Sequence, residues 1–361
     1  MIMSEKSKQH IDSCRFCWMC HHICPIGNAT GQERSTPRAR ALGLSLVNRD
    51  AIDLSEVMDN VYECATCGAC VHECVTGWDP VMFAKEARLQ AALEDKLPPY
   101  INTMVENCLT FGNAYGKNAL CQSLTAAINA HSAQTDTLFF LGVDARYMMC
   151  AEACKAVAVL DKAGVAFTLL ENEAPSGAQL EFLIGKADET AEMMAACAKV
   201  LNGYKTVVVY DPEDAKTIKQ LYKEYGIEVK ATVVTYTAFL ASLLKENKLK
   251  AQKSDTRVVY QDPYQLARDL EETEEAREVI GAFAELSEMH LNRKETVFAG
   301  NILMAQYIPK VIEEVAKRRI FNAKSIGATA IVTASVSEYA ALKAAAEEGF
   351  AIYSLEDLIL Q

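Results

Sequence analysis

The sequence has no segment typical of proteins that enter or cross a membrane. Nowhere do eighteen uncharged apolar residues follow one another, and the first ten residues include no apolar stretch of a secretory signal. We therefore expect a cytoplasmic protein without direct membrane insertion. Tracts rich in proline, glycine and serine are also missing, and half of the residues are apolar. With 361 residues the chain is long enough for two or three compact modules.

An excess of basic residues is missing as well. The chain has 36 Lys and Arg against 48 Asp and Glu, which gives a formal net charge of −12. Without a basic stripe to neutralise phosphates, a nucleic-acid partner is disfavoured. No G-x-G-x-x-G follows a predicted strand, and the segment 112–118 resembles a phosphate loop with the wrong glycine spacing. The sequence thus offers no nucleotide site.

Cysteine, by contrast, is abundant. Thirteen are present, and a reducing cytoplasm makes a disulfide framework an unsuitable explanation for them. Eight lie in two runs with the same internal spacing, C-x2-C-x2-C-x3-C, at positions 14–24 and 64–74. This is the bacterial ferredoxin pattern for a [4Fe-4S] cluster, in which the fourth cysteine of each run normally binds the neighbouring cluster. The runs therefore predict two [4Fe-4S] clusters, the first held by Cys14, Cys17, Cys20 and Cys74 and the second by Cys64, Cys67, Cys70 and Cys24.

A pair of zinc sites is the main alternative. Zinc usually takes two Cys pairs separated by a spacer, which is not the pattern found here. His21 and His22, next to Cys20, are expected outside the ligand set because a full set of thiolates is present. Cys150 and Cys154 lie one helical turn apart and either bind a metal or pack in an Ala-rich helix, with packing favoured. The remaining isolated cysteines are expected to pack in the core, namely Cys108, Cys121 and Cys197.

The rest of the chain predicts an α+β multidomain protein. Amphipathic segments at 37–46 and 80–93, each with proline in the first turn, predict an α-helical ferredoxin domain over residues 1–100. Residues 101–136 form a helical linker. Strand-like apolar runs at 137–143, 164–170, 206–210, 257–260 and 328–333 alternate with helical stretches at 148–163, 189–201, 271–286 and 305–323. This alternation predicts two pseudo-repeated α/β modules, at 137–250 and 251–361.

Several motifs also carry a family resemblance. Residues 24–31 (CPIGNATG), 35–40 (STPRAR), 77–80 (GWDP) and 113–116 (NAYG) resemble the iron–sulfur subunits related to heterodisulfide reductase. That group includes the iron–sulfur subunits of anaerobic glycerol-3-phosphate dehydrogenase and of glycolate and D-lactate oxidases. The resemblance implies two cluster sites followed by paired α/β modules. In the relatives, each module carries a lone Cys, a Cys-Cys-Gly and a Cys-Pro-x-Cys that can hold a further iron–sulfur centre.

This chain has lost those module cysteines. In the first module Val143, Pro175-Ser176-Gly177 and Asp211-Pro212-Glu213-Asp214 stand in their places. The second module has Tyr264, residues 298–300 (FAG) and residues 335–338 (SVSE). Because iron–sulfur ligation needs thiolates, we expect no third cluster and no disulfide or quinone chemistry there. The acidic segment 211–214 is expected to be a solvated turn rather than a cation site.

These features predict an electron-transfer subunit of an oxidoreductase complex. It would relay single electrons through its two clusters between a flavoprotein, of the dehydrogenase or electron-transfer type, and another redox carrier. We identify no catalytic residue, so the chain is not expected to catalyse a reaction alone, and a hetero-oligomer follows. The alternative is a self-contained reductase whose cluster-free α/β modules bind a substrate or a cofactor.

Overall fold

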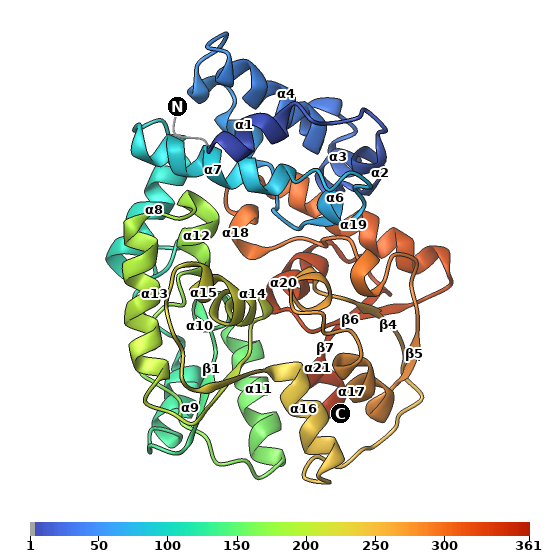
Figure 1. Ribbon diagram of the computed structural model, residues 1–361. Helices are drawn as coiled ribbons and strands as arrows, with labels where there is room; N and C mark the ends of the chain where they lie inside the picture. Colours follow the sequence, from blue (N-terminus) through green and yellow to red (C-terminus); the bar gives the residue numbers. More distant parts are fainter. Residues whose placement is uncertain (1–3) are drawn as a thin grey trace.

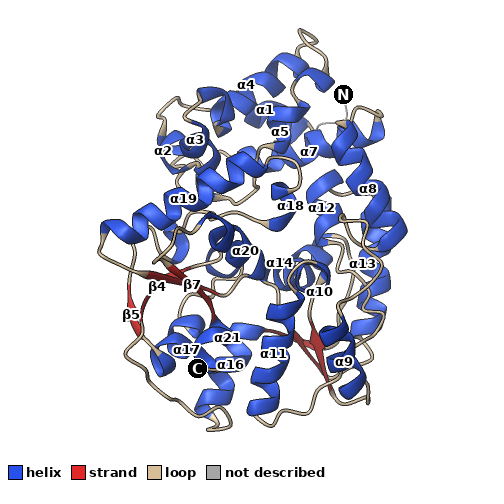
Figure 2. Cartoon of the chain, turned by 180° about the vertical axis from the view of Figure 1, so that it is seen from behind, coloured by secondary structure: helices blue, strands red, loops and turns tan. Residues whose placement is uncertain are grey.

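A computed structural model describes residues 4–361. The helices of the N-terminal part, blue in Figure 1, gather at one end of the molecule, and every described strand lies in the remainder (Figures 1 and 2). Helices α18 and α19 of the C-terminal part lie against the N-terminal helices (Figure 1). The architecture is therefore a mixture of helices and parallel sheets, with the N-terminal helices packed on the sheet-containing part.

The N-terminal part is entirely helical where it is regular. Two predicted helices appear where expected, and α7 has the predicted bounds. Each begins with proline after a capping side chain: Thr36 Oγ1 accepts from Ala39 N, and Asp79 Oδ1 accepts from Val81 N and Met82 N. The elements are α1 Glu5–Ile11, α2 Met19–Ile23, α3 Pro25–Thr30, η1 Glu33–Ser35, α4 Pro37–Asn48, η2 Leu54–Glu56, α5 Met58–Tyr62, α6 Ala69–His72 and α7 Pro80–Leu93.

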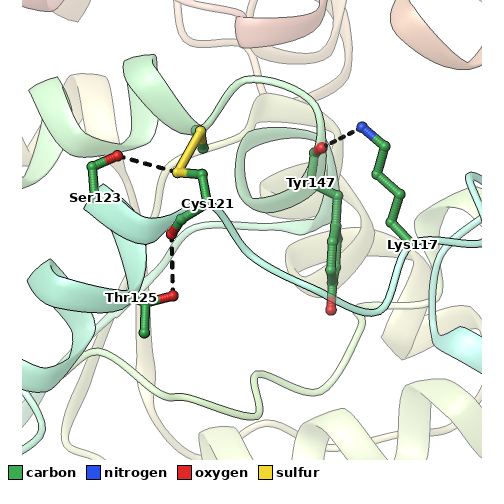
Figure 3. The surroundings of a disulfide bond; sticks show 6 residues. Lys117, Cys121, Ser123, Thr125 and Tyr147 are labelled. Carbon is green, nitrogen blue, oxygen red and sulfur yellow. Dashed lines mark hydrogen bonds between the residues drawn. A yellow bond between two sulfur atoms is a disulfide. The ribbon is translucent and has the colours of Figure 1, made fainter.

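Two helices follow, α8 Pro99–Phe111 and α9 Gln122–Ala130. Figure 3 shows the start of α9 joined to the sheet-containing part by a disulfide between Cys121 and Cys150, 29 residues apart. The expectation that these two cysteines are separate packing residues is wrong, because folding brings their Cα atoms to 6.5 Å. Lys117, in the same stretch, donates a hydrogen bond to the carbonyl oxygen of Tyr147 (Figure 3). The linker is thus fixed to the first half at two points.

The first sheet is parallel, in the order β1 (Thr137–Phe140), β2 (Thr206–Val209) and β3 (Thr232–Thr235). The strand predicted at 164–170 is reduced to a single parallel bridge between Thr168 and Leu138, on the free edge of β1. Helices of this half are α10 Val143–Tyr147, α11 Cys150–Lys162, α12 Ala178–Ile184, α13 Asp188–Leu201, α14 Pro212–Lys216, η3 Thr217–Leu221, α15 Tyr222–Glu224 and α16 Tyr236–Lys245.

The second sheet is also parallel, in the order β5 (Glu285–Ser287), β4 (Arg257–Gln261), β6 (Ala330–Thr333) and β7 (Ala351–Ser354). If the bridging segment at Thr168 counts as a strand, both halves arrange their strands as second, first, third and fourth in chain order. Helices of this half are η4 Gln265–Asp269, α17 Glu275–Phe283, η5 Arg293–Glu295, α18 Ile302–Ala305, α19 Pro309–Ser325, α20 Val336–Ala345 and α21 Leu355–Ile359.

Apolar cores run across the boundaries between these parts. One core joins Leu44 and Phe83 of the N-terminal helices to Leu183 of the first half and Phe298 of the second. A second core joins Phe139 of β1 to Val332 of β6. Cys108 and Cys197 are buried in such cores, as predicted. No helix within residues 4–361 is both long enough and apolar enough to span a bilayer.

Candidate iron–sulfur centres

The two cysteine runs fold into loops with the same backbone conformation. In the first loop Phe16 and Trp18 have positive φ, at 57° and 68°. In the second loop Thr66 and Gly68 occupy the corresponding positions, at 51° and 72°. A left-handed conformation at three non-glycine residues costs free energy and persists only where the surroundings impose it. The matching backbone geometry therefore indicates that the two cysteine loops are structurally equivalent.

Backbone N–H groups point at several of the sulfur atoms. Phe16 N and Thr66 N donate to Cys14 Sγ and Cys64 Sγ, each at 3.4 Å, which repeats the equivalence of the two loops. Gly27 N donates to Cys24 Sγ at 3.4 Å, and Trp78 N donates to Cys74 Sγ at 3.3 Å. Hydrogen bonds to ligating sulfur withdraw electron density and raise the reduction potential of an iron–sulfur centre.

Four of the predicted ligands line a single small cavity. These are Cys24, Cys64, Cys67 and Cys70, and Pro25, Ile26 and Val81 are among the residues that complete its apolar wall. Burial raises the pKa of Cys67 to about 11 and places that of Cys70 well above its usual range. Thiolates in such surroundings need a cation, and iron is one. The residues present thus fit a cubane cluster, and this is the set of four predicted for the second site.

Arg40, at the start of α4, lines the same cavity. Its side chain is buried, its Nε donates to Asn60 O at 2.8 Å, and its Nη2 makes no hydrogen bond within the described chain. Glu63 lies 4.0 Å from that Nη2. Burial alone would lower the pKa of Arg40, but the thiolates of Cys64 and Cys24 reverse the shift. The cavity is thus supplied with a permanent positive charge that can face an anionic cluster.

Two further arginines hold the second loop from outside. Arg88, fully buried, donates to Cys64 O at 2.7 Å and to Phe182 O at 2.8 Å. Arg268 of η4 donates twice to Cys67 O, at 3.1 and 2.6 Å. Phe182 belongs to the first half and Arg268 to the second, so the second half contacts this loop directly and the first half is linked to it through Arg88. No sequence pattern pointed to the roles of Arg88 and Arg268. Arg40, by contrast, lies in the motif STPRAR (residues 35–40), which the sequence analysis had singled out.

The first loop is closer to the surface. Cys14 and Cys20 are partly buried, and Cys17 is exposed, as are Phe16, Trp18 and Met19. Cys74 belongs to a segment that packs on the end of α1: Trp78 Nε1 donates to His10 O at 2.9 Å, and Asp79 N donates to His10 Nε2 at 2.8 Å. His21 and His22 stand on α2 in edge-to-face contact with each other. The ligand sets of both sites stay predictions.

A second cavity, of about 50 Å³, lies where the two halves meet. It is lined by residues at positions where the family resemblance leads one to expect cysteine, namely Val143, Asp211, Asp214 and Tyr264. The expectation of a solvated turn at 211–214 is wrong, because Asp211 and Asp214 are each only 4% exposed. The reason is that α14 begins at this turn and packs against η4 of the second half.

The chain is similar to several known proteins. Residues 10–78 match the 4Fe-4S dicluster domain. The chain is 26% identical over 353 residues to one subunit of the dihydromethanophenazine:CoB–CoM heterodisulfide reductase of Methanosarcina acetivorans, and the match covers 90% of this chain and 86% of that protein. It is 20% identical over 329 residues to one subunit of the fumarate reductase (CoM/CoB) of Methanothermobacter marburgensis, covering 89% of this chain and 65% of the relative.

A third relative is an uncharacterized iron–sulfur protein of Methanocaldococcus jannaschii, 23% identical over 338 residues, with 91% of this chain and 66% of that protein aligned. All three matches extend far beyond the dicluster domain, into the sheet-containing halves. They agree with the resemblance carried by the sequence motifs. The chain is therefore a homologue of these heterodisulfide reductase and fumarate reductase subunits, within a group of iron–sulfur proteins, and begins with a 4Fe-4S domain.

Proposed function

We propose that this chain is an electron-transfer subunit with two [4Fe-4S] clusters, working between a flavoprotein and another redox carrier. One cluster would be held by Cys14, Cys17, Cys20 and Cys74, and the other by Cys64, Cys67, Cys70 and Cys24. The observation that carries the proposal is the pair of loops with one backbone conformation, one of which closes a four-cysteine cavity beside Arg40. Bound clusters of this type supply one-electron redox chemistry.

The chain's own residues would position the clusters and set their potentials. Apolar side chains around Cys24, Cys67 and Cys70 exclude water from the second site, which strengthens every electrostatic interaction inside it. Arg40 adds a positive charge there, and N–H groups donate to sulfur at both loops. The positive charge and the N–H donors each favour the more negative, reduced state of a bound cluster.

The first loop is the better place for electrons to enter or leave. Phe16 and Trp18 are 53% and 41% exposed, and Met19 beside them is also exposed. The guanidinium of Arg38 stacks on both aromatic rings, with its carbon 4.3 and 4.1 Å from the ring centroids. An exposed apolar face next to a redox site suits a transient protein contact. We assign this face to the flavoprotein, in a cytoplasmic hetero-oligomer, because the relatives are named as subunits of reductases.

The halves at 137–250 and 251–361 would then serve as a scaffold. Their equal strand order supports an origin as two copies of one module, following the domain of residues 1–100 and the linker at 101–136. Their contacts with the second loop, through Arg88 and Arg268, give the scaffold a second task, which is to hold that loop in place. Complex formation and cluster retention would both depend on these halves.

Metal analysis of the anaerobically purified chain tests the proposal. We expect about eight iron and eight acid-labile sulfide per chain, as two cubanes require. Cys24→Ser and Cys74→Ser should each lose about half of the iron, from different sites, whereas Cys154→Ser should keep all of it. Four or fewer iron atoms in the wild-type chain would contradict two clusters, and zinc in place of iron would contradict electron transfer altogether.

The self-contained reductase remains a second candidate, and the cavity between the halves is the observation that favours it. Anaerobic affinity purification separates the two functions. A flavoprotein that co-purifies and reduces the clusters supports the subunit. Turnover of a substrate by the isolated chain with an artificial electron donor supports the reductase.

A further inference from the structure

The cavity between the halves has no role in holding the proposed clusters, yet both halves contribute polar groups to it. From the first half come Asp144 of α10 and Asp211, Glu213 and Asp214 at the start of α14. The second half supplies Tyr264, Gln265, Asn301 and Ser337. Gly142, at φ 83°, borders the site, and a Cβ there would overlap with Asp214 Oδ2. The close approach at this glycine makes room for the Asp214 carboxylate.

Four carboxylates surround this cavity with little positive charge to balance them. Lys216 lies 3.4 Å from Glu213. Within residues 4–361, no Lys, Arg or His nitrogen lies within 4.0 Å of the carboxylate oxygens of Asp144, Asp211 or Asp214. Asp144 is instead bound by neutral donors, Tyr115 Oη at 2.6 Å and Ser337 Oγ at 2.8 Å among them. Buried carboxylates without cations are costly, so the cavity favours a positively charged occupant.

Two buried oxygen atoms in the same cavity have no hydrogen-bond partner in the described chain. One is Oδ2 of Asp211, whose Oδ1 accepts from Glu213 N at 2.8 Å. The other is Oε1 of Gln265, a residue only 7% exposed. The amide orientation of Gln265 is fixed, because its Nε2 donates to Glu213 Oε2 at 2.8 Å. Both unpartnered atoms are hydrogen-bond acceptors, one from each half. A cation can bind both of these oxygen atoms.

We propose that this cavity binds one hydrated divalent cation of the Mg²⁺ or Mn²⁺ type, with Asp211 and Gln265 as its principal oxygen ligands. Hard cations of this kind prefer carboxylate and amide oxygens. Mg²⁺ gives up its waters reluctantly and is usually held by only one or two carboxylates.

The spacing of the carboxylates agrees with a hydrated ion. Within residues 4–361, only His72, Glu73 and Glu295 bring three Cys, His, Asp or Glu ligand atoms within 4.8 Å of one another. The carboxylates of the cavity are thus too far apart to coordinate one bare ion as a group of three. Water molecules of the ion can cover that distance and reach Asp144 and Asp214. An ion held in this way joins the two halves at their interface.

Titration of the anaerobic, EDTA-treated holoprotein with Mn²⁺, followed by the EPR signal of free Mn²⁺, tests the site. We expect about one Mn²⁺ per wild-type chain, competed by Mg²⁺, and affinity weakened by about tenfold or more in Asp211→Asn and in Gln265→Leu. Glu189→Gln removes an exposed carboxylate on α13 and serves as the matched control with unchanged affinity. Glu295→Gln, at the exposed His72–Glu73–Glu295 group, should also leave the affinity unchanged.

Three results would overturn the proposal: no binding by the wild-type chain at millimolar Mn²⁺, equal affinity in the wild type and both cavity variants, or loss of affinity only in Glu295→Gln. The wild-type titration decides the question even if one variant fails to fold. Iron and sulfide contents are measured on the same samples, so failure of the cation site is distinct from failure of the proposed electron-transfer function.

Discussion

Arg268 and Cys67 lie 201 residues apart in the sequence, yet two guanidinium N–H groups of Arg268 donate to the carbonyl oxygen of Cys67, at 3.1 and 2.6 Å. The same guanidinium donates to the carbonyl oxygens of Lys294 and Thr296. One side chain of the second half therefore binds both a cysteine loop and the loop of its own half that contains η5. The cysteine loop depends on a distant part of the chain for its position.

Replacing Arg268 should destabilise the chain and loosen the second cysteine loop. In Arg268→Ala three carbonyl oxygens lose a charged donor, which we expect to cost about 2–4 kcal/mol of unfolding free energy. Denaturant unfolding of the holoprotein measures the loss, and the rate of iron release to a chelator should rise with it. Arg257→Ala, on β4 with a side chain 79% exposed, is the control and should stay within about 0.5 kcal/mol of the wild type. Equal stability of both variants would contradict a bracing role for Arg268.

The charge on Arg40 should raise the reduction potential of the cluster proposed at Cys24, Cys64, Cys67 and Cys70. A buried positive charge stabilises the reduced state, so Arg40→Gln should lower the potential by about 50–100 mV, as a Coulomb interaction of about 2 kcal/mol over several ångströms predicts. An EPR-monitored redox titration measures it. Arg40→Lys should have a reduction potential close to that of the wild type, because it keeps the positive charge. Arg49→Gln changes an exposed residue after the same helix and should leave the reduction potential unchanged. An unchanged potential in Arg40→Gln would remove Arg40 from the tuning of this site.

The Cys121–Cys150 disulfide should stabilise the oxidised chain. Closing a loop between residues 29 positions apart restricts the unfolded chain and contributes about 3.6 kcal/mol in the entropic treatment. We expect a lower melting temperature after mild thiol reduction of the wild type, and no further change on reducing Cys121→Ser. Peptide mapping without reductant should recover the linked pair. Cys154→Ser is the control, and its response to reductant should match the wild type.

Glu338 should make the stability of the second half depend on pH. Burial raises the pKa of Glu338 to about 8, with Asp262 adding to the shift and Gln261 and Arg319 opposing it. The folded-state pKa lies above the ordinary value of about 4.3, so protonated Glu338 stabilises the folded chain. This contribution to the free energy of unfolding is complete below about pH 4 and is lost as the pH rises to about 8. Relative to Glu338→Gln, the wild type should lose on the order of 3–5 kcal/mol across this range. Parallel pH profiles of the two chains would show that Glu338 does not titrate there.

Local sequence signals predicted the cysteine loops and several helices well. Cysteine spacing is a short-range property, and α7 begins and ends where proline and amphipathic periodicity place it. The segment 164–170 contains a strand-like apolar run but forms only one bridge, because only Thr168 reaches the edge of β1. Strands β3, β5 and β7 were missed because they lie at the edges of their sheets and are less buried than β1, β2 and β6.

Contacts between distant segments were beyond the reach of sequence patterns. The segment 211–214 reads as an exposed acidic turn, yet the packing of α14 against η4 buries Asp211 and Asp214. Cys121 and Cys150 show no common spacing motif, and only the packing of α9 on α11 brings them together. Arg88 and Arg268 likewise reveal their roles only in three dimensions. Sequence reasoning thus found the cysteines proposed to bind iron and missed the arginines that hold their loop in place.

The two cysteine loops differ in solvent exposure, and this difference should determine the order in which their clusters are oxidised in air. Cys17 is exposed, whereas Cys67 and Cys70 are buried. Dioxygen reaches the outer loop first, so oxidative decay should proceed through a long-lived form that retains only the inner iron. Material handled aerobically would then resemble a single-cluster protein, and anaerobic handling from cell lysis onward becomes a condition for counting its cofactors correctly.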